Sequence, residues 1–120
     1  MAIDVKCGVG SHLMLDCFGC PPEKLSEIGF IYDFLESFPE RIGMTRLSPP
    51  SVFKYQGKIK EDWGISGVVM IAESHISVHT FPEKQHAFID IFSRTEFDLD
   101  HARRILLEMF SPAHDEITLK

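Results

Sequence analysis

The stretch from Ala72 to Glu83 constrains the fold of this chain more than any other part of it. An apolar run, residues 67–71, leads into it, and the residues after Ser74 alternate in character with the period of a β-strand. One side of that strand carries Ile76, Val78 and Thr80. The opposite side carries His75, Ser77, His79, Phe81 and Glu83. The alternation fits an edge strand with polar residues outward, and it fits a functional site equally well.

Patterns in the rest of the chain predict the elements around this strand. Apolar residues at helical spacing predict one helix from Glu23 to about Phe38, ended by Pro39, and a second that begins near Asp98 as N-cap and stops before Pro112. Residues 58–62 are charged and are expected to form a loop. Strands are expected over 11–18, 42–47, 52–55, 66–72, 75–81, 87–93 and 116–119, with Pro49-Pro50 interrupting the second.

The short links between these segments favour hairpins. The expected order is β-α-β-β-β-α-β, or the same order with its second strand split. Hairpin-length links favour a mainly antiparallel sheet, and both helices are expected to cover one of its faces. The sequence therefore predicts an α+β two-layer sandwich, and the length of 120 residues predicts a single domain over 1–120.

The net charge and the cysteines limit the partners and the compartment. A formal net charge of −6 argues against a nucleic acid or an anionic membrane as a partner. The chain shows neither a basic, apolar N-terminal segment nor an apolar run near membrane length, so a cytoplasmic location is expected. The cysteines are three, Cys7, Cys17 and Cys20, and this odd number without a secretory signal fits reduced thiols.

Two of these cysteines form a CxxC motif, which raises the question of a metal site. Cys7 and His12 lie close to Cys17 and Cys20 in the sequence, as zinc ligands could. No second CxxC exists, however, and small buried cysteines are common in strands, so no metal site is predicted. A redox motif is disfavoured as well, because Pro21-Pro22 follows Cys20 where an active-site helix would continue.

A family resemblance sharpens the interpretation of the central stretch. The segments Glu73-Ser74-His75 and His79-Thr80-Phe81-Pro82-Glu83, preceded by Gly64-Ile65-Ser66-Gly67, resemble the small prokaryotic S-adenosylmethionine decarboxylases. The local match runs from about Gly64 to Phe92, and the order of elements fits the whole chain. These enzymes are pyruvoyl-dependent and are made as a proenzyme. The resemblance implies cleavage between Glu73 and Ser74, giving a β chain of residues 1–73 and an α chain of residues 74–120.

The chemistry of such a cleavage can be written from the bonds involved. The Ser74 hydroxyl attacks the Glu73 carbonyl and converts the amide to an ester. Loss of the Ser74 α-proton then eliminates the Glu73 carboxylate and leaves dehydroalanine, which hydrolyses to a pyruvoyl group. The reaction needs a strained turn, a donor for the oxyanion and a base. In the family, the oxyanion donor and the base are a serine and a histidine at positions matching Ser66 and His79.

The resemblance also implies how a substrate is bound and used. The pyruvoyl ketone can form a Schiff base with a substrate α-amine and accept the electrons released with carbon dioxide, as pyridoxal phosphate does. Glu83 matches the family glutamate that binds the ribose hydroxyls, and Phe81 stands where the family usually has tryptophan. A homodimer with active sites near its interface is expected, because a domain this small has little depth for a cavity.

Two positions depart from the family pattern. Arg94 occupies the place of the cysteine that donates a proton after decarboxylation, and an arginine is a poor proton donor near neutral pH, although it could bind a carboxylate. The aromatic residue that helps to sandwich the adenine is replaced by Lys60, with Trp63 nearby as a substitute. Three hypotheses follow: an S-adenosylmethionine decarboxylase of spermidine biosynthesis, which we favour; a decarboxylase of another amino acid such as ornithine or arginine; or a non-enzymatic paralogue.

Overall fold

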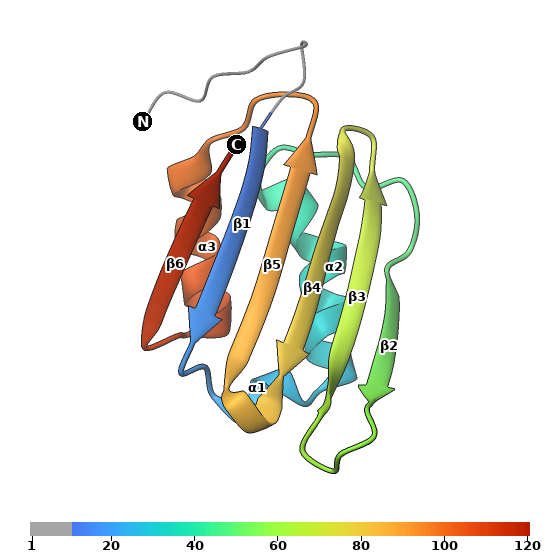
Figure 1. Cartoon of the computed structure of the whole chain (residues 1–120). Coiled ribbons are helices and arrows are strands. Elements are labelled where there is room, and N and C mark those ends of the chain that lie inside the picture. The colour runs from blue at the N-terminus through green and yellow to red at the C-terminus, as the bar shows by residue number, and fades with distance from the viewer. Residues whose placement is uncertain (1–10) are drawn as a thin grey trace.

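A computed structural model describes residues 11–120, which fold into one six-stranded sheet and helices packed on it (Figure 1). The order of strands across the sheet is β2-β3-β4-β5-β1-β6, and every adjacent pair is antiparallel. The strands are β1 (Ser11–Phe18), β2 (Ser51–Gln56), β3 (Trp63–Ile71), β4 (Ser74–Phe81), β5 (His86–Ser93) and β6 (His114–Leu119). The helices are α1 (Pro22–Leu25), α2 (Ile28–Arg41), α3 (Leu99–Phe110) and the 3-10 turn η1 (Pro82–Lys84). The predicted α+β two-layer sandwich with a mainly antiparallel sheet is confirmed.

The core lies between the sheet and the two long helices, which both pack on the same face (Figure 1). Every second strand residue points into it, and these side chains are almost completely buried, as for Leu13, Leu15, Ile76, Val78 and Ile89. The helices contribute aromatic rings, and Phe34 of α2 meets Phe110 of α3 edge to face with ring centres 5.1 Å apart. The core therefore fixes which residues of each strand face away from the helices.

One polar group inside this core has its hydrogen bonds satisfied. The Thr80 hydroxyl of β4 is buried, donates to the carbonyl of Leu25 at 2.8 Å and accepts from the backbone N–H of Ile65 at 3.0 Å. These contacts tie the end of β4 to α1 and to β3.

The helix predicted from Glu23 to about Phe38 is two helices, α1 and α2, separated at Ser26-Glu27, and α2 ends later than the sequence predicts. Pro39 lies inside α2, and the expectation that it ends the helix is wrong. Proline restricts the residue before it and removes its own N–H, but its carbonyl still accepts hydrogen bonds. The N–H groups of Ile42 and Met44 donate to that carbonyl at 3.2 and 2.8 Å.

The expected strand over 42–47 is also wrong. Ile42 caps α2, Gly43 adopts a positive φ of 77°, and these residues close the helix. Only an isolated bridge between Arg46 and Ile71 joins this segment to β3. The strand here is β2 instead, so four strands, β2 to β5, lie between α2 and α3, where the expected order had three, or four with its second strand split.

Most other element predictions are confirmed. The strand over 11–18 and the three strands after Gly64 form as expected, and the Asp98 side chain caps α3 by accepting from the N–H of His101 at 3.0 Å. Strand β6 begins at His114, two residues before the expected start. Within residues 11–120, no helix is both long and apolar enough to cross a membrane.

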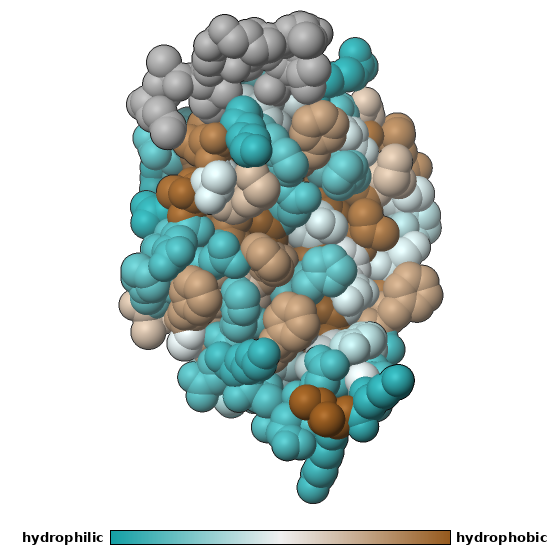
Figure 2. Space-filling model, viewed as in Figure 1, coloured by the Kyte–Doolittle hydropathy of each residue, from teal (hydrophilic) through white to brown (hydrophobic). Residues whose placement is uncertain are grey.

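Within residues 11–120, no helix packs on the second face of the sheet, which we call the open face. Figure 2 views this face and shows hydrophobic side chains scattered among polar ones. The strand registers place the polar side of β4, from His75 to Phe81, at its centre. Large apolar side chains surround these residues and are between 37 and 65% exposed: Phe53, Tyr55, Val68, Met70 and Phe88. The open face is thus both the chemically richest and the least covered surface of the sheet.

Candidate active site

Ser74 opens β4 directly after the tight turn from β3. It pairs with Ile71 on one side and with Ser93 on the other, and its side chain is half-buried. The Ser74 Oγ lies 3.3 Å from Nδ1 of the following residue, His75. The turn residue Glu73 is held by its carboxylate, which accepts from the backbone N–H of Thr45 at 3.3 Å. The expected cleavage point is therefore an ordered turn.

The Glu73 carbonyl has a donor in place. Its oxygen accepts a hydrogen bond of 3.1 Å from the backbone N–H of Arg94, just beyond β5. An N–H group at this distance stabilises negative charge that develops on a carbonyl oxygen under nucleophilic attack. Sequence reasoning considered only the side chain at position 94, because a backbone donor leaves no signal in a motif.

Ser66 and His79 form a second group on the open face. They pair across β3 and β4, and Ser66 Oγ lies 2.9 Å from His79 Nδ1. At about 3.3 Å per strand residue, the five steps from Ser74 to His79 span roughly 16 Å. The structure brings Ser66 and His79 together, but within one chain it does not bring them to Ser74.

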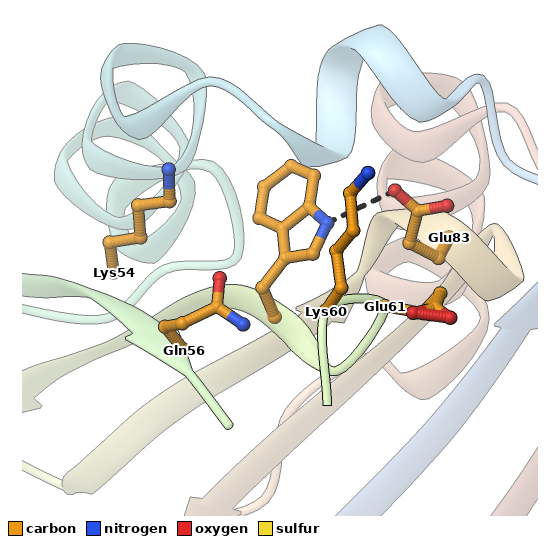
Figure 3. Close-up of a pocket in the computed structure, with 6 residues that line it drawn as sticks. Lys54, Gln56, Lys60, Glu61 and Glu83 are labelled. Atoms are coloured by element: carbon orange, nitrogen blue, oxygen red, sulfur yellow. Dashed lines mark hydrogen bonds between the residues drawn. The ribbon is translucent and has the colours of Figure 1, made fainter. Parts of the chain in front are cut away.

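Two of the expected substrate-binding residues, Phe81 and Glu83, lie at or just beyond the far end of β4. Glu83 sits in η1, and its carboxylate accepts a hydrogen bond of 3.1 Å from the indole N–H of Trp63 (Figure 3). The ammonium of Lys54 lies 5.1 Å from the centre of the same indole ring. A recess of about 610 Å³ opens here and is lined by Lys54, Gln56, Lys60, Glu61, Trp63 and Glu83.

Aromatic rings continue from this recess across the open face. Phe81 lies 5.8 Å from the ring of His86, which stacks on Phe18 of β1 at 4.7 Å. His86 Nε2 also meets the Asp16 carboxylate at 3.1 Å. The sequence alone does not assign Phe18 or His86 to this region, because only the strand order places β1 beside β5.

Comparisons with known proteins identify the family of this chain. A family model described as S-adenosylmethionine decarboxylase matches residues 11–119. This chain belongs to the S-adenosylmethionine decarboxylase family.

Individual relatives cover most of the chain. It is 34% identical over 112 residues to the S-adenosylmethionine decarboxylase proenzymes of Pyrococcus furiosus and Thermococcus kodakarensis, which spans 92% of this chain and 76% and 73% of those proteins. The structure is similar to the crystal structure of the adenosylmethionine decarboxylase from Aquifex aeolicus, with a TM-score of 0.74 and 26% identity over 92% of this chain and 87% of that one.

Two residues that depart from the pattern of the S-adenosylmethionine decarboxylase family, Arg94 and Lys60, both lie beside candidate site residues. The side chain of Arg94 is exposed beside the Glu73–Ser74 turn, while its backbone N–H serves the Glu73 carbonyl. Lys60 lines the recess at Glu83 without offering a ring, and Trp63 supplies the aromatic surface there. It stays a prediction that Trp63 replaces the missing aromatic residue, and the position of Trp63 beside Glu83 is compatible with it.

Cys17 and Cys20 lie apart from the site. Cys17 and Cys20 are fully buried in the core, and a hydrogen bond from Cys17 to Cys20, together with burial, raises the pKa of the Cys17 thiol above its ordinary value. His12 faces the opposite side of the sheet, where it pairs with Asp90. Cys7 falls outside the described residues. Within residues 11–120, no group of three or more His, Cys, Asp or Glu side chains is arranged to hold a metal ion.

Proposed function

We propose that this chain is a self-processing, pyruvoyl-dependent decarboxylase that acts on S-adenosylmethionine. The observation that carries the proposal is the hydrogen bond from the Arg94 N–H to the Glu73 carbonyl, next to the Ser74 hydroxyl, in a chain that belongs to this decarboxylase family. This bond equips the Glu73–Ser74 amide for nucleophilic attack by its own serine.

The residues around the turn support the first chemical step. Ser74 Oγ forms a bond to the Glu73 carbonyl carbon, the electron pair moves to the carbonyl oxygen, and the Arg94 N–H stabilises the resulting charge. Collapse breaks the bond from carbon to the Ser74 nitrogen and leaves an ester. Because the donor is a backbone group, the exchange of cysteine for arginine at position 94 does not remove it.

The second step removes the Ser74 α-proton, and we assign it to His79 oriented by Ser66. These side chains share a hydrogen bond of 2.9 Å, which holds the imidazole in one orientation. The product is a pyruvoyl group derived from Ser74. Once formed, this group supplies an electrophilic carbonyl that accepts the electrons released with carbon dioxide.

The distance between Ser74 and His79 supports a homodimer. Since roughly 16 Å separates them along β4, the base must come from a second copy. Two open faces packed about a two-fold axis near Ser77, midway between Ser74 and His79, would place the partner's His79 at Ser74 and, by symmetry, this His79 at the partner's Ser74. Such packing would also bury the exposed Phe53, Val68 and Phe88.

The same packing completes a substrate site. Glu83 is assigned to the ribose hydroxyls and Phe81 to one wall of the adenine site, and both follow His79 at the end of β4 that would lie beside the partner's Ser74. The indole N–H of Trp63 orients the Glu83 carboxylate. Arg94, at the other end of β4, is assigned to the substrate carboxylate.

No observation favours the other two hypotheses, decarboxylation of ornithine or arginine and a non-enzymatic paralogue. The reaction proposed here would serve spermidine biosynthesis. The cytoplasmic location, the absence of a nucleic-acid partner and the single-domain assignment over 1–120 stay predictions.

Intact-mass measurement and a substrate screen test the proposal. Wild-type protein should split between Glu73 and Ser74. Ser74→Ala should stay a single chain, with the 13.7 kDa mass of the uncut protein less one oxygen atom. Release of carbon dioxide should then be measured with S-adenosylmethionine, ornithine and arginine. A wild-type protein that stays whole after prolonged incubation refutes self-processing, and release from ornithine or arginine alone refutes the assigned substrate.

A further inference from the structure

We infer that His75 is the catalytic residue that takes the proton from the Ser74 hydroxyl when self-processing begins. The inference rests on the function proposed above and adds a residue to its first step. The Nδ1 atom of His75 lies 3.3 Å from Ser74 Oγ. Within the described part of the chain, His75 is the one side chain that lies within hydrogen-bond distance of that oxygen.

The first step needs a base of its own. A serine hydroxyl is a weak nucleophile until an adjacent base removes its proton. His79 is committed to the second step and is held by Ser66 at 2.9 Å. The carboxylate of Glu73 accepts a hydrogen bond from the N–H of Thr45, so we do not assign it as the base for the Ser74 hydroxyl. His75 alone combines the right distance with an accepting nitrogen.

The surroundings of His75 leave its imidazole free to exchange protons. The ring is half-buried on the open face, with the ring centre of Phe92 5.8 Å away on β5 and Met70 in register on β3. The charged groups nearest along the same face are Asp90 and His12, and they pair with each other. No ion pair therefore fixes the charge of His75 within the described residues.

Two more charged groups flank the turn side of His75, and neither competes for its proton. The Glu73 carboxylate is bound to a backbone N–H, and the Arg94 side chain is exposed.

The proton balance of the step is complete without another reactant. Neutral His75 accepts the hydroxyl proton at Nδ1 while Ser74 Oγ bonds to the Glu73 carbonyl carbon. When the bond from that carbon to the Ser74 nitrogen breaks, the nitrogen takes a proton from Nδ1 and leaves as an amine. His75 returns to its neutral form, and the net change is conversion of an amide to an ester.

The test compares processing rates of His75→Gln with wild type by intact mass. Glutamine keeps hydrogen-bonding capacity but cannot take up a proton at neutral pH. We expect His75→Gln to process about 10²-fold or more slowly, without accumulating a bond that hydroxylamine cleaves. His79→Ala, in contrast, should accumulate such an ester. His114→Gln, the same change at an exposed histidine of β6, is the matched control and should process like wild type.

Two further measurements separate a chemical role from a structural one. Added imidazole should restore processing of His75→Gln at least in part, and the wild-type rate should rise with pH through the histidine range while the variant rate should not. A folded His75→Gln or His75→Asn that processes at the wild-type rate, or that accumulates the ester, overturns the inference. A wild-type chain that never splits overturns the proposed function instead, so the two failures are distinguishable.

Discussion

The backbone N–H of Arg94 donates to the carbonyl oxygen of Glu73 across 3.1 Å, at the end where β4 begins and β5 ends. One residue thereby has two separable parts. Its backbone belongs to the proposed self-processing step, while its side chain occupies the place of the family's proton donor. The two activities can consequently be altered independently at a single position.

Arg94→Pro tests the backbone part, because proline lacks the N–H group. We expect processing to slow by about 10²- to 10³-fold, the usual cost of losing one oxyanion donor. Arg94→Ala keeps the N–H and should process at the wild-type rate. Intact mass over time measures both, and far-ultraviolet circular dichroism checks that each variant is folded. A folded Arg94→Pro protein that processes normally would remove this donor from the mechanism.

Arg94→Cys tests the side-chain part. A thiol gives up a proton near neutral pH far more readily than a guanidinium does, so turnover of S-adenosylmethionine should rise if this position must donate a proton. If Arg94 instead binds the substrate carboxylate, KM for the true substrate should increase about tenfold or more. Kinetics on S-adenosylmethionine, ornithine and arginine decide between these outcomes. Identical kinetics of variant and wild type on every substrate would assign neither role to this side chain.

Mixed dimers test whether the base comes from the partner. Ser74→Ala and His79→Ala should each fail to complete processing alone. Co-expressed with different tags, the His79→Ala chain should be cleaved, because it keeps Ser74 and receives His79 from the Ser74→Ala chain. The Ser74→Ala chain should stay whole. Purified mixed dimers in which neither chain is cleaved would contradict catalysis across the interface.

Thr80→Val tests the buried hydroxyl that joins β4 to α1. The change leaves the Leu25 carbonyl and the Ile65 N–H without their buried partner and should lower the free energy of unfolding by about 2 kcal/mol. Urea unfolding of the unprocessed Ser74→Ala background measures this loss without chain cleavage. Thr118→Val, an exposed change on β6, is the control and should stay within about 0.5 kcal/mol.

Alternation within strands explains how much of the fold could be predicted. The inward Ile76 and Val78 and the outward His75 and His79 were assigned correctly, because a strand with one buried face leaves no other register. The strand expected over 42–47 failed, since its apolar residues also suit a helix end, and backbone hydrogen bonds to Pro39 decided the outcome. The local sequence pattern does not reveal which backbone N–H groups will donate to the Pro39 carbonyl.

The candidate site shows a different limit. A motif match assembles Ser66, Ser74 and His79 into one site, although the rise along β4 keeps Ser74 and His79 apart. The Arg94 N–H, and the rings of Phe18 and His86 at the opposite end of β5, emerge only once β5 lies between β4 and β1. Sequence thus identified the residue types of the site, and topology determined which of them can meet.

The strand order has a consequence for the processed protein. Cleavage before Ser74 would assign β1, β2 and β3 to one fragment and β4, β5 and β6 to the other. In the sheet, however, β1 lies between β5 and β6, and β3 pairs with β4. The two fragments are therefore interlaced, and neither can depart without breaking three ladders at once. Maturation would cut the chain without dividing the molecule, and the new terminus would stay where the uncut turn had held it.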